Sequence, residues 1–289
     1  MPGTFSDSWK LTKTSFRLIR EDRALLVFPV VAGLSILGVL VLFLLGALWL
    51  FPLVLAGGAA TTHYEVLGAL LFVALYFAIS FISVYTTAAL VGAATLKLNG
   101  QQPTAADGWR IARSKFVRLL AWSLITATVG LAIQVISSRV RGVGGILIGA
   151  VGGATWGVVT YFMIPVLVYE DLGAWKSLSR SARLYISNFG RSIVTNLVLG
   201  LLIGAGIVVA VVLGTVGLLV LVGGSVIVGL VLIVVAIAVA AAVLLIGATA
   251  EGVLQAALYR YATTGKIDPD MLPAPLRSGG VRADPTVLP

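Results

Sequence analysis

The sequence predicts an all-α, polytopic membrane protein with six transmembrane helices and three amphipathic helices at the cytoplasmic interface. Of its 289 residues, 59% are hydrophobic and 11% are charged, whereas a soluble domain has about 45–50% apolar and about 25% charged residues. The apolar residues form unbroken blocks, each long enough for the helix of about 20 residues that crosses a bilayer. The basic residues flank these blocks, as they do in membrane proteins.

The six helices are expected at about 24–51, 65–98, 119–138, 143–169, 192–214 and 225–262. Pro52 ends the first block, and the turn-forming residues 99–103 end the second. The last block is too long for one crossing, so we expect a turn between Gly214 and Gly224, with Gly223 and Gly224 as the breaker. Together these helices make a single transmembrane domain over residues 1–265. Residues 266–289 are polar and Pro-rich, which predicts a disordered cytoplasmic tail.

The basic residues predict the orientation of the chain. In this arrangement only Arg139 and Arg141 fall on one side of the membrane, and the other 18 of the 20 Lys and Arg residues fall on the opposite side. The positive-inside rule makes the crowded side cytoplasmic. We therefore expect a multi-pass protein of the cell membrane with both its N-terminus and its C-terminus in the cytoplasm.

Three cytoplasmic segments, 7–17, 107–116 and 175–183, resemble one another. The first two share Asp, Trp, two basic residues and Phe at equal spacing, and the third keeps the Trp followed by a basic residue. On a helix the apolar and basic residues fall on adjoining faces, which suits a helix lying at the headgroups of anionic lipids. The expected lipid-contacting residues are Trp9, Lys10, Lys13, Phe16, Arg17, Trp109, Arg110, Arg113, Trp175, Lys176, Arg180 and Arg183. A threefold repeat and ordinary basic flanks of membrane helices both explain the pattern.

Several segments resemble a known family. They are residues 8–29, 88–100, 121–125, 164–171, 179–182 and 258–265. They are similar to an uncharacterised family of prokaryotic multi-pass integral membrane proteins, a domain of unknown function, over nearly the whole chain. The pattern of Pro165 to Glu170, then Arg180-Ser181, then Asn188-Phe189-Gly190 is also similar to the membrane domain of glycerophosphodiester phosphodiesterases. The first resemblance implies an integral membrane protein and brings no activity or functional residues with it.

Polar residues inside the last two helices form a candidate intramembrane cluster. Glu251 precedes Gln255 by one helical turn, and Asn196 in the fifth helix is expected within reach of Glu251. Counted from Tyr261, Glu251 is about 15 Å deep in a hydrocarbon core of about 30 Å. Such a carboxyl group is expected to face the helix bundle, either joining the two helices by hydrogen bonds or serving transport.

Glu170 and Asp171, at the end of the fourth helix, point in different directions on a helix. They therefore do not make an acid/base couple by themselves. Pairing of this carboxylate pair with Arg180 or Arg183 is the expectation.

The residue content argues against an enzyme. The chain has no cysteine and one histidine, His63, and it has no nucleotide-binding motif, nucleophile triad or paired catalytic carboxylates. We therefore expect no enzyme activity, no cofactor and no metal. The basic residues do not form one surface run, so nucleic acid is not expected, and the expected partner is the lipid bilayer with its anionic headgroups. The favoured function is a non-enzymatic membrane scaffold, assembly or lipid-interacting protein. A small transporter or channel with a polar path near Glu251 is the alternative, and a membrane enzyme acting on lipid comes third.

Overall fold

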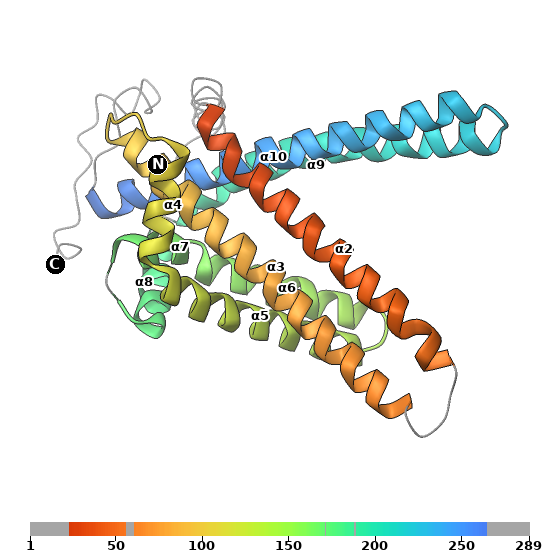
Figure 1. Cartoon of the computed structure of the whole chain (residues 1–289). Helices are drawn as coiled ribbons and strands as arrows, with labels where there is room; N and C mark the ends of the chain where they lie inside the picture. The colour runs from red at the N-terminus through yellow and green to blue at the C-terminus, as the bar shows by residue number, and fades with distance from the viewer. Residues whose placement is uncertain (1–22, 56–60, 171, 188, 265–289) are drawn as a thin grey trace. The chain divides into compact units, whose positions relative to one another are not determined.

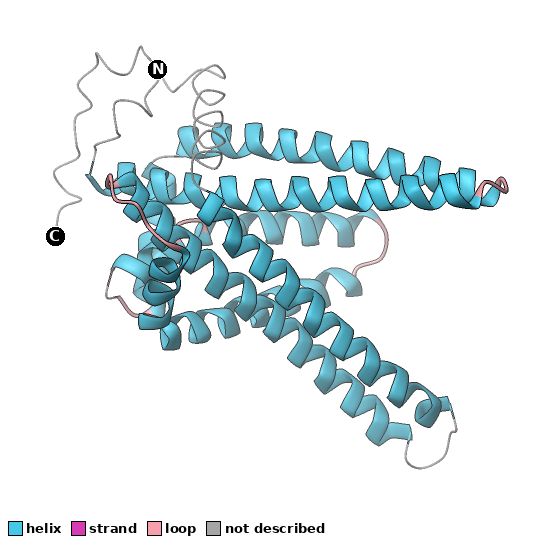
Figure 2. Ribbon diagram, turned by 45° about the horizontal axis from the view of Figure 1, so that its top comes forward, coloured by secondary structure: helices cyan, strands magenta, loops and turns pink. Residues whose placement is uncertain are grey.

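The computed structural model describes residues 23–55, 61–170, 172–187 and 189–264, and every regular element among these residues is helical (Figures 1 and 2). The elements are η1 (Arg23–Leu26), α2 (Val27–Leu55), α3 (Thr61–Leu98), α4 (Ala105–Ser114), α5 (Phe116–Arg139), α6 (Val143–Thr160), α7 (Met163–Tyr169), α8 (Ala174–Ser187), α9 (Phe189–Val222) and α10 (Val226–Thr264). Within the described residues, six helical segments are long and apolar enough to cross a membrane, with α6 and α7 counted together. The predicted all-α, six-span membrane architecture is confirmed.

The chain divides into two compact units. The first unit comprises Met1–Val27, Ala93–Pro103 and Leu184–Pro289, and the second comprises Phe28–Gly92 and Thr104–Arg183. The single transmembrane domain expected over residues 1–265 stays a prediction. The expected tail, residues 266–289, and the first amphipathic segment, with Trp9, Lys10, Lys13, Phe16 and Arg17, lie outside the described residues.

The second unit is held together by polar and aromatic contacts between its helices. Ser80 of α3 donates a hydrogen bond from its Oγ to the carbonyl of Ser123 on α5, at 3.0 Å. Trp122 of α5 stacks on Trp156 of α6 with 5.8 Å between the ring centroids. Small and hydroxyl-bearing residues allow membrane helices to approach closely, because lipid tails provide no hydrophobic drive between helices.

The fourth span is broken, although the sequence predicts one helix over 143–169. The break falls between α6 and α7, at Tyr161 and Phe162. Pro165 has no N–H to bond the Tyr161 carbonyl, which interrupts the helical hydrogen bonds. The freed N–H of Phe162 donates to the Oγ of Ser181 on α8 at 3.0 Å, and Ser181 is fully buried. A break at membrane depth is tolerated when the protein itself satisfies the freed backbone groups.

In the first unit, α9 and α10 run side by side as an antiparallel hairpin (Figure 1). The turn occupies residues 223–225, where Gly224 has a φ of 97° that favours glycine. Helix α9 ends at Val222 and not at the expected residue 214. Gly214 is an ordinary helical residue within α9. Glycines on each helix face branched side chains of the other, in the pairs Gly206–Val243, Gly217–Ile233, Gly229–Leu221 and Gly247–Ile203. These pairs keep one antiparallel register along the hairpin.

Candidate functional site

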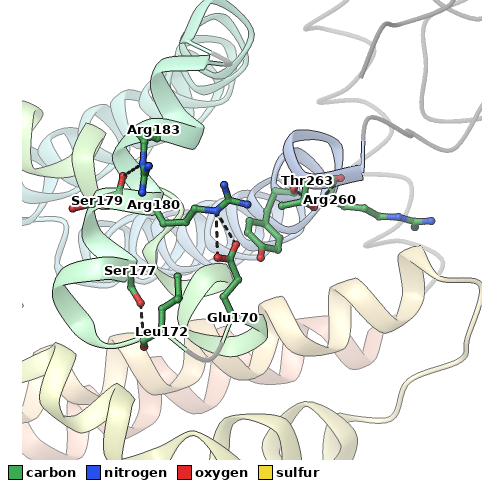
Figure 3. Close-up of polar contacts among 9 residues, drawn as sticks. Glu170, Leu172, Ser177, Ser179, Arg180, Arg183, Arg260 and Thr263 are labelled. Atoms are coloured by element: carbon green, nitrogen blue, oxygen red, sulfur yellow. Dashed lines mark hydrogen bonds and ion pairs between the residues drawn. The ribbon is translucent and has the colours of Figure 1, made fainter. Parts of the chain in front are cut away.

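The short helix α8 is attached to the chain before it by side-chain contacts (Figure 3). The Nε of Arg180 donates to both carboxylate oxygens of Glu170 at 3.2 Å, and the two side chains are 24% and 22% exposed. The Oγ of Ser177 donates to the Leu172 carbonyl at 3.4 Å, and Ser177 is fully buried. The predicted pairing of Glu170 with a basic residue of α8 is confirmed. These contacts and the Ser181 bond to Phe162 determine which face of α8 points outward.

The outward face of α8 has an apolar edge and a basic edge. Trp175 is 75% exposed and Ile186 is 68% exposed, and the two lie at neighbouring angles on the helix. Lys176, Ser179 and Arg183 are exposed beside them. An exposed tryptophan next to basic side chains is typical of a helix at a membrane surface.

The corresponding helix α4 has a different outward face. Trp109 is half-buried and packs against Phe28 and Tyr85, with ring centroids 5.3 Å and 5.7 Å apart. The exposed residues of α4 include Arg110 and Arg113, and no exposed aromatic accompanies them. Trp109 thus packs in part against its own protein, and its contact with lipid stays a prediction.

The N-terminus of α4 is closed by a reciprocal capping box. The Asp107 N–H donates to the Thr104 hydroxyl oxygen at 3.3 Å, and the Thr104 N–H donates to the Asp107 carboxylate at 2.9 Å. The Thr104 backbone and hydroxyl bonds, with Arg110 at 2.7 Å, lower the pKa of Asp107. Arg110 thus forms an ion pair with Asp107. Arg113 is also exposed on α4, and among the described residues no such ion pair involves it.

The three residues of the expected intramembrane cluster, Glu251, Gln255 and Asn196, differ in burial. Glu251 is exposed, whereas Gln255 is buried and Asn196 is half-buried. Asn196 and Gln255 each have an interaction partner, and among the described residues no hydrogen bond or ion pair reaches the Glu251 side chain. The glycine register places Asn196 level with Leu254, three residues beyond Glu251 and one before Gln255. The expected cluster of Glu251, Gln255 and Asn196 stays a prediction.

The length of the hairpin changes the expected depth of Glu251. The turn at 223–225 exposes backbone groups that cannot be left unsatisfied in hydrocarbon, so it must reach the headgroups or water. Glu251 follows Gly224 by 27 residues, or about 40 Å of helix against a hydrocarbon core of about 30 Å. Even if the hairpin tilts by about 40°, the upper end of the usual range, these residues still span about 31 Å along the membrane normal. This length predicts that Glu251 lies in the headgroup layer opposite the turn, where an exposed carboxylate would be stable.

The residues that attach α8, Ser177 and Ser181, were not singled out from the sequence. Their spacing of four residues places both on one face of a helix, and that spacing was the available signal. Within the described part of the chain, no group of three His, Asp or Glu side chains is arranged as metal ligands. The absence of a metal or cofactor stays a prediction.

Residues 62–268 match a protein-family model whose description is "Family of unknown function (DUF6159)". No curated protein and no solved structure matches the chain. The similarity to glycerophosphodiester phosphodiesterases and the prokaryotic origin therefore stay predictions.

Proposed function

Because the chain belongs to the family of unknown function DUF6159, its role must be argued from its own residues, and we propose a non-enzymatic protein that organises anionic lipid. In this proposal it spans the cell membrane six times, with both termini in the cytoplasm. Its short basic helices α4 and α8 lie at the cytoplasmic leaflet. Its partners are then the anionic headgroups of that leaflet.

The outward face of α8 is the observation that supports this proposal most strongly. A tryptophan that is 75% exposed, with Ile186 at 68%, is unfavourable in water and favourable at the boundary of headgroups and acyl chains. Lys176 and Arg183 lie beside these side chains and are exposed. Each basic residue near an anionic surface contributes about 1 kcal/mol.

The placement of charge along the spans also supports a role without transport. Glu251 is the residue on which a polar transport path depends, and the length of the hairpin favours a position for it in the headgroup layer. The small transporter or channel is therefore the second candidate. A membrane enzyme acting on lipid is disfavoured, because no described constellation supplies a nucleophile with a base.

The test uses the full chain reconstituted into vesicles of phosphatidylcholine, with or without phosphatidylglycerol. We expect phosphatidylglycerol to raise the unfolding temperature, and we expect no flux of protons, sodium or potassium above that of empty vesicles. Flux that Glu251→Gln abolishes would replace this proposal with the transporter. An unfolding temperature that is the same with and without phosphatidylglycerol would also contradict the proposed function.

A further inference from the structure

The geometry of α8 points to a defined site for one lipid phosphate, formed by Lys176, Ser179 and Arg183. We refer to these three residues as the basic stripe. This inference rests on the proposed function, since it requires α8 to lie at the membrane surface. It goes further by assigning the headgroup chemistry to three side chains and by excluding Arg180.

The basic stripe follows one line on the surface of α8. Its members are three and four residues apart, so they lie above one another on one face of the helix. Ser179 is about 4.5 Å along the axis from Lys176 and about 6 Å from Arg183. Both long side chains can therefore reach a phosphate placed over the Ser179 hydroxyl, which can donate a third hydrogen bond.

Arg183 is already oriented toward this position. Its Nε donates to the Ser179 carbonyl at 3.3 Å (Figure 3), which directs the side chain back along the helix toward Ser179. This contact uses Nε, so the two terminal nitrogens stay available for a bidentate contact with phosphate oxygens. A preoriented guanidinium loses less conformational entropy on binding than one that is free in solvent.

Arg180 is excluded from the basic stripe by its ion pair. Its Nε is bound to Glu170, and the 24% exposure of its side chain shows that it is largely covered. The sequence predicts lipid contact for Arg180 and Arg183 alike, since both are basic residues of one amphipathic segment. The structure separates them into a residue that attaches α8 and a residue that faces outward.

The apolar edge formed by Trp175 and Ile186 decides between a lipid and a free phosphate. These side chains adjoin the basic stripe on the outward face of α8 and contribute nothing to a water-soluble phosphate. They match the acyl-chain boundary that lies directly below a lipid phosphate. The occupant is therefore the phosphodiester headgroup of an anionic lipid.

The test titrates the full chain, purified in a mild detergent, with phosphatidylglycerol and counts bound lipids by native mass spectrometry. We expect Lys176→Gln/Arg183→Gln to weaken the tightest lipid on the order of tenfold, and Ser179→Ala to weaken it a fewfold. Arg139→Gln/Arg141→Gln is the matched control, because both arginines are exposed in the opposite loop, and it should bind as the parent does. The altered side chains are exposed, so the unfolding temperatures should agree.

Three outcomes contradict the inference in different ways. If the α8 variant binds phosphatidylglycerol as tightly as the parent while both prefer it to phosphatidylcholine, the site is wrong and the proposed function stands. If the parent shows no such preference, the proposed function fails as well. If inorganic phosphate or glycerol phosphate displaces the lipid at equal concentration, the site takes free phosphate and not a lipid, and unchanged lipid binding by Trp175→Ala would overturn the role given to the apolar edge.

Discussion

Arg180 and Glu170 are joined across the loop between α7 and α8, with the arginine Nε 3.2 Å from each carboxylate oxygen. The two side chains are about a quarter exposed, so the pair lies between a solvated surface pair, which contributes about 0–1 kcal/mol, and a fully buried one. This pair holds α8 so that Trp175 faces outward. The attachment of α8 and its outward chemistry thus depend on separate residues.

Removing one member of this pair should destabilise the second unit. Glu170→Gln leaves the partly covered guanidinium without its counter-charge, and we expect a loss of about 1–2 kcal/mol in the free energy of unfolding. The double variant Glu170→Gln/Arg180→Gln should recover part of that loss, since no unpaired charge remains. Unfolding in detergent, measured for both single variants and the double variant, gives the coupling energy. A coupling near zero would mean that solvent already screens the pair.

Gly108 of α4 is required by a close approach of two helices. A Cβ at this position would lie 2.5 Å from Cζ of Phe28 and 2.6 Å from the Ala89 carbonyl oxygen, and the backbone oxygen cannot rotate away. We expect Gly108→Ala to lower stability by about 1–3 kcal/mol through overpacking. Gly153→Ala on α6 is the control, because nothing lies within 4 Å of its Cβ position. Thermal unfolding that treats the two substitutions alike would contradict this packing.

Much of the fold could be predicted from the sequence because lipid leaves few alternatives. Unbroken apolar blocks must cross as helices, and Gly223 and Gly224 are the residues that form the turn of the last hairpin. The break at Phe162 could not be predicted from apolar content. Pro165 was its signal, and the Ser181 hydroxyl that satisfies the freed N–H comes from a segment 19 residues away.

The candidate site was predicted less well, for a physical reason. Trp109 and Trp175 occupy equivalent positions in similar amphipathic segments, yet the first packs on Phe28 and the second is exposed. Periodicity shows that a helix has an apolar face, but lipid tails and protein side chains are equally apolar partners for it. Likewise, the depth of Glu251 depends on where the turn lies, and counting from the cytoplasmic end gives a different depth from counting from the turn.

The hairpin of α9 and α10 should be sensitive to substitution at its glycines. A Cβ on Gly206 would lie 2.7 Å from Cγ2 of Val243, whereas nothing lies within 4 Å at Gly204 on the same helix. We expect Gly206→Ala to destabilise the hairpin by about 1–2 kcal/mol, since a valine side chain has few rotamers in a helix. Gly204→Ala should be neutral or slightly stabilising. Equal unfolding temperatures for the two variants would show that the helices do not meet in this register.

The capping box of α4 should make stability depend on pH. The hydrogen bonds from Thr104 lower the pKa of Asp107 in the folded chain, so the folded state binds this proton less readily than the unfolded state. The stabilisation is therefore present above the unfolded pKa and is lost as the pH falls through the folded pKa. The difference in unfolding temperature between the parent and Asp107→Asn should shrink from about pH 7 to about pH 3. A difference that is constant over this range would exclude the ionised carboxylate as its source.

Glu251 provides the sharpest test of how the hairpin sits in the bilayer. The chain has no cysteine, so Glu251→Cys and Val234→Cys each introduce a single reactive thiol. Both positions are exposed in the structure, Val234 at 64%, but Val234 follows Gly224 by 10 residues, or about 15 Å, which is the middle of the hydrocarbon. In membranes opened to reagent on both faces, a charged maleimide should label Glu251→Cys and leave Val234→Cys unmodified, because a thiolate forms only where water reaches. Both should react after solubilisation and unfolding. Protection of Glu251→Cys equal to that of Val234→Cys would place the carboxylate inside the hydrocarbon, where an ionisable side chain is a functional candidate, and would favour the transporter.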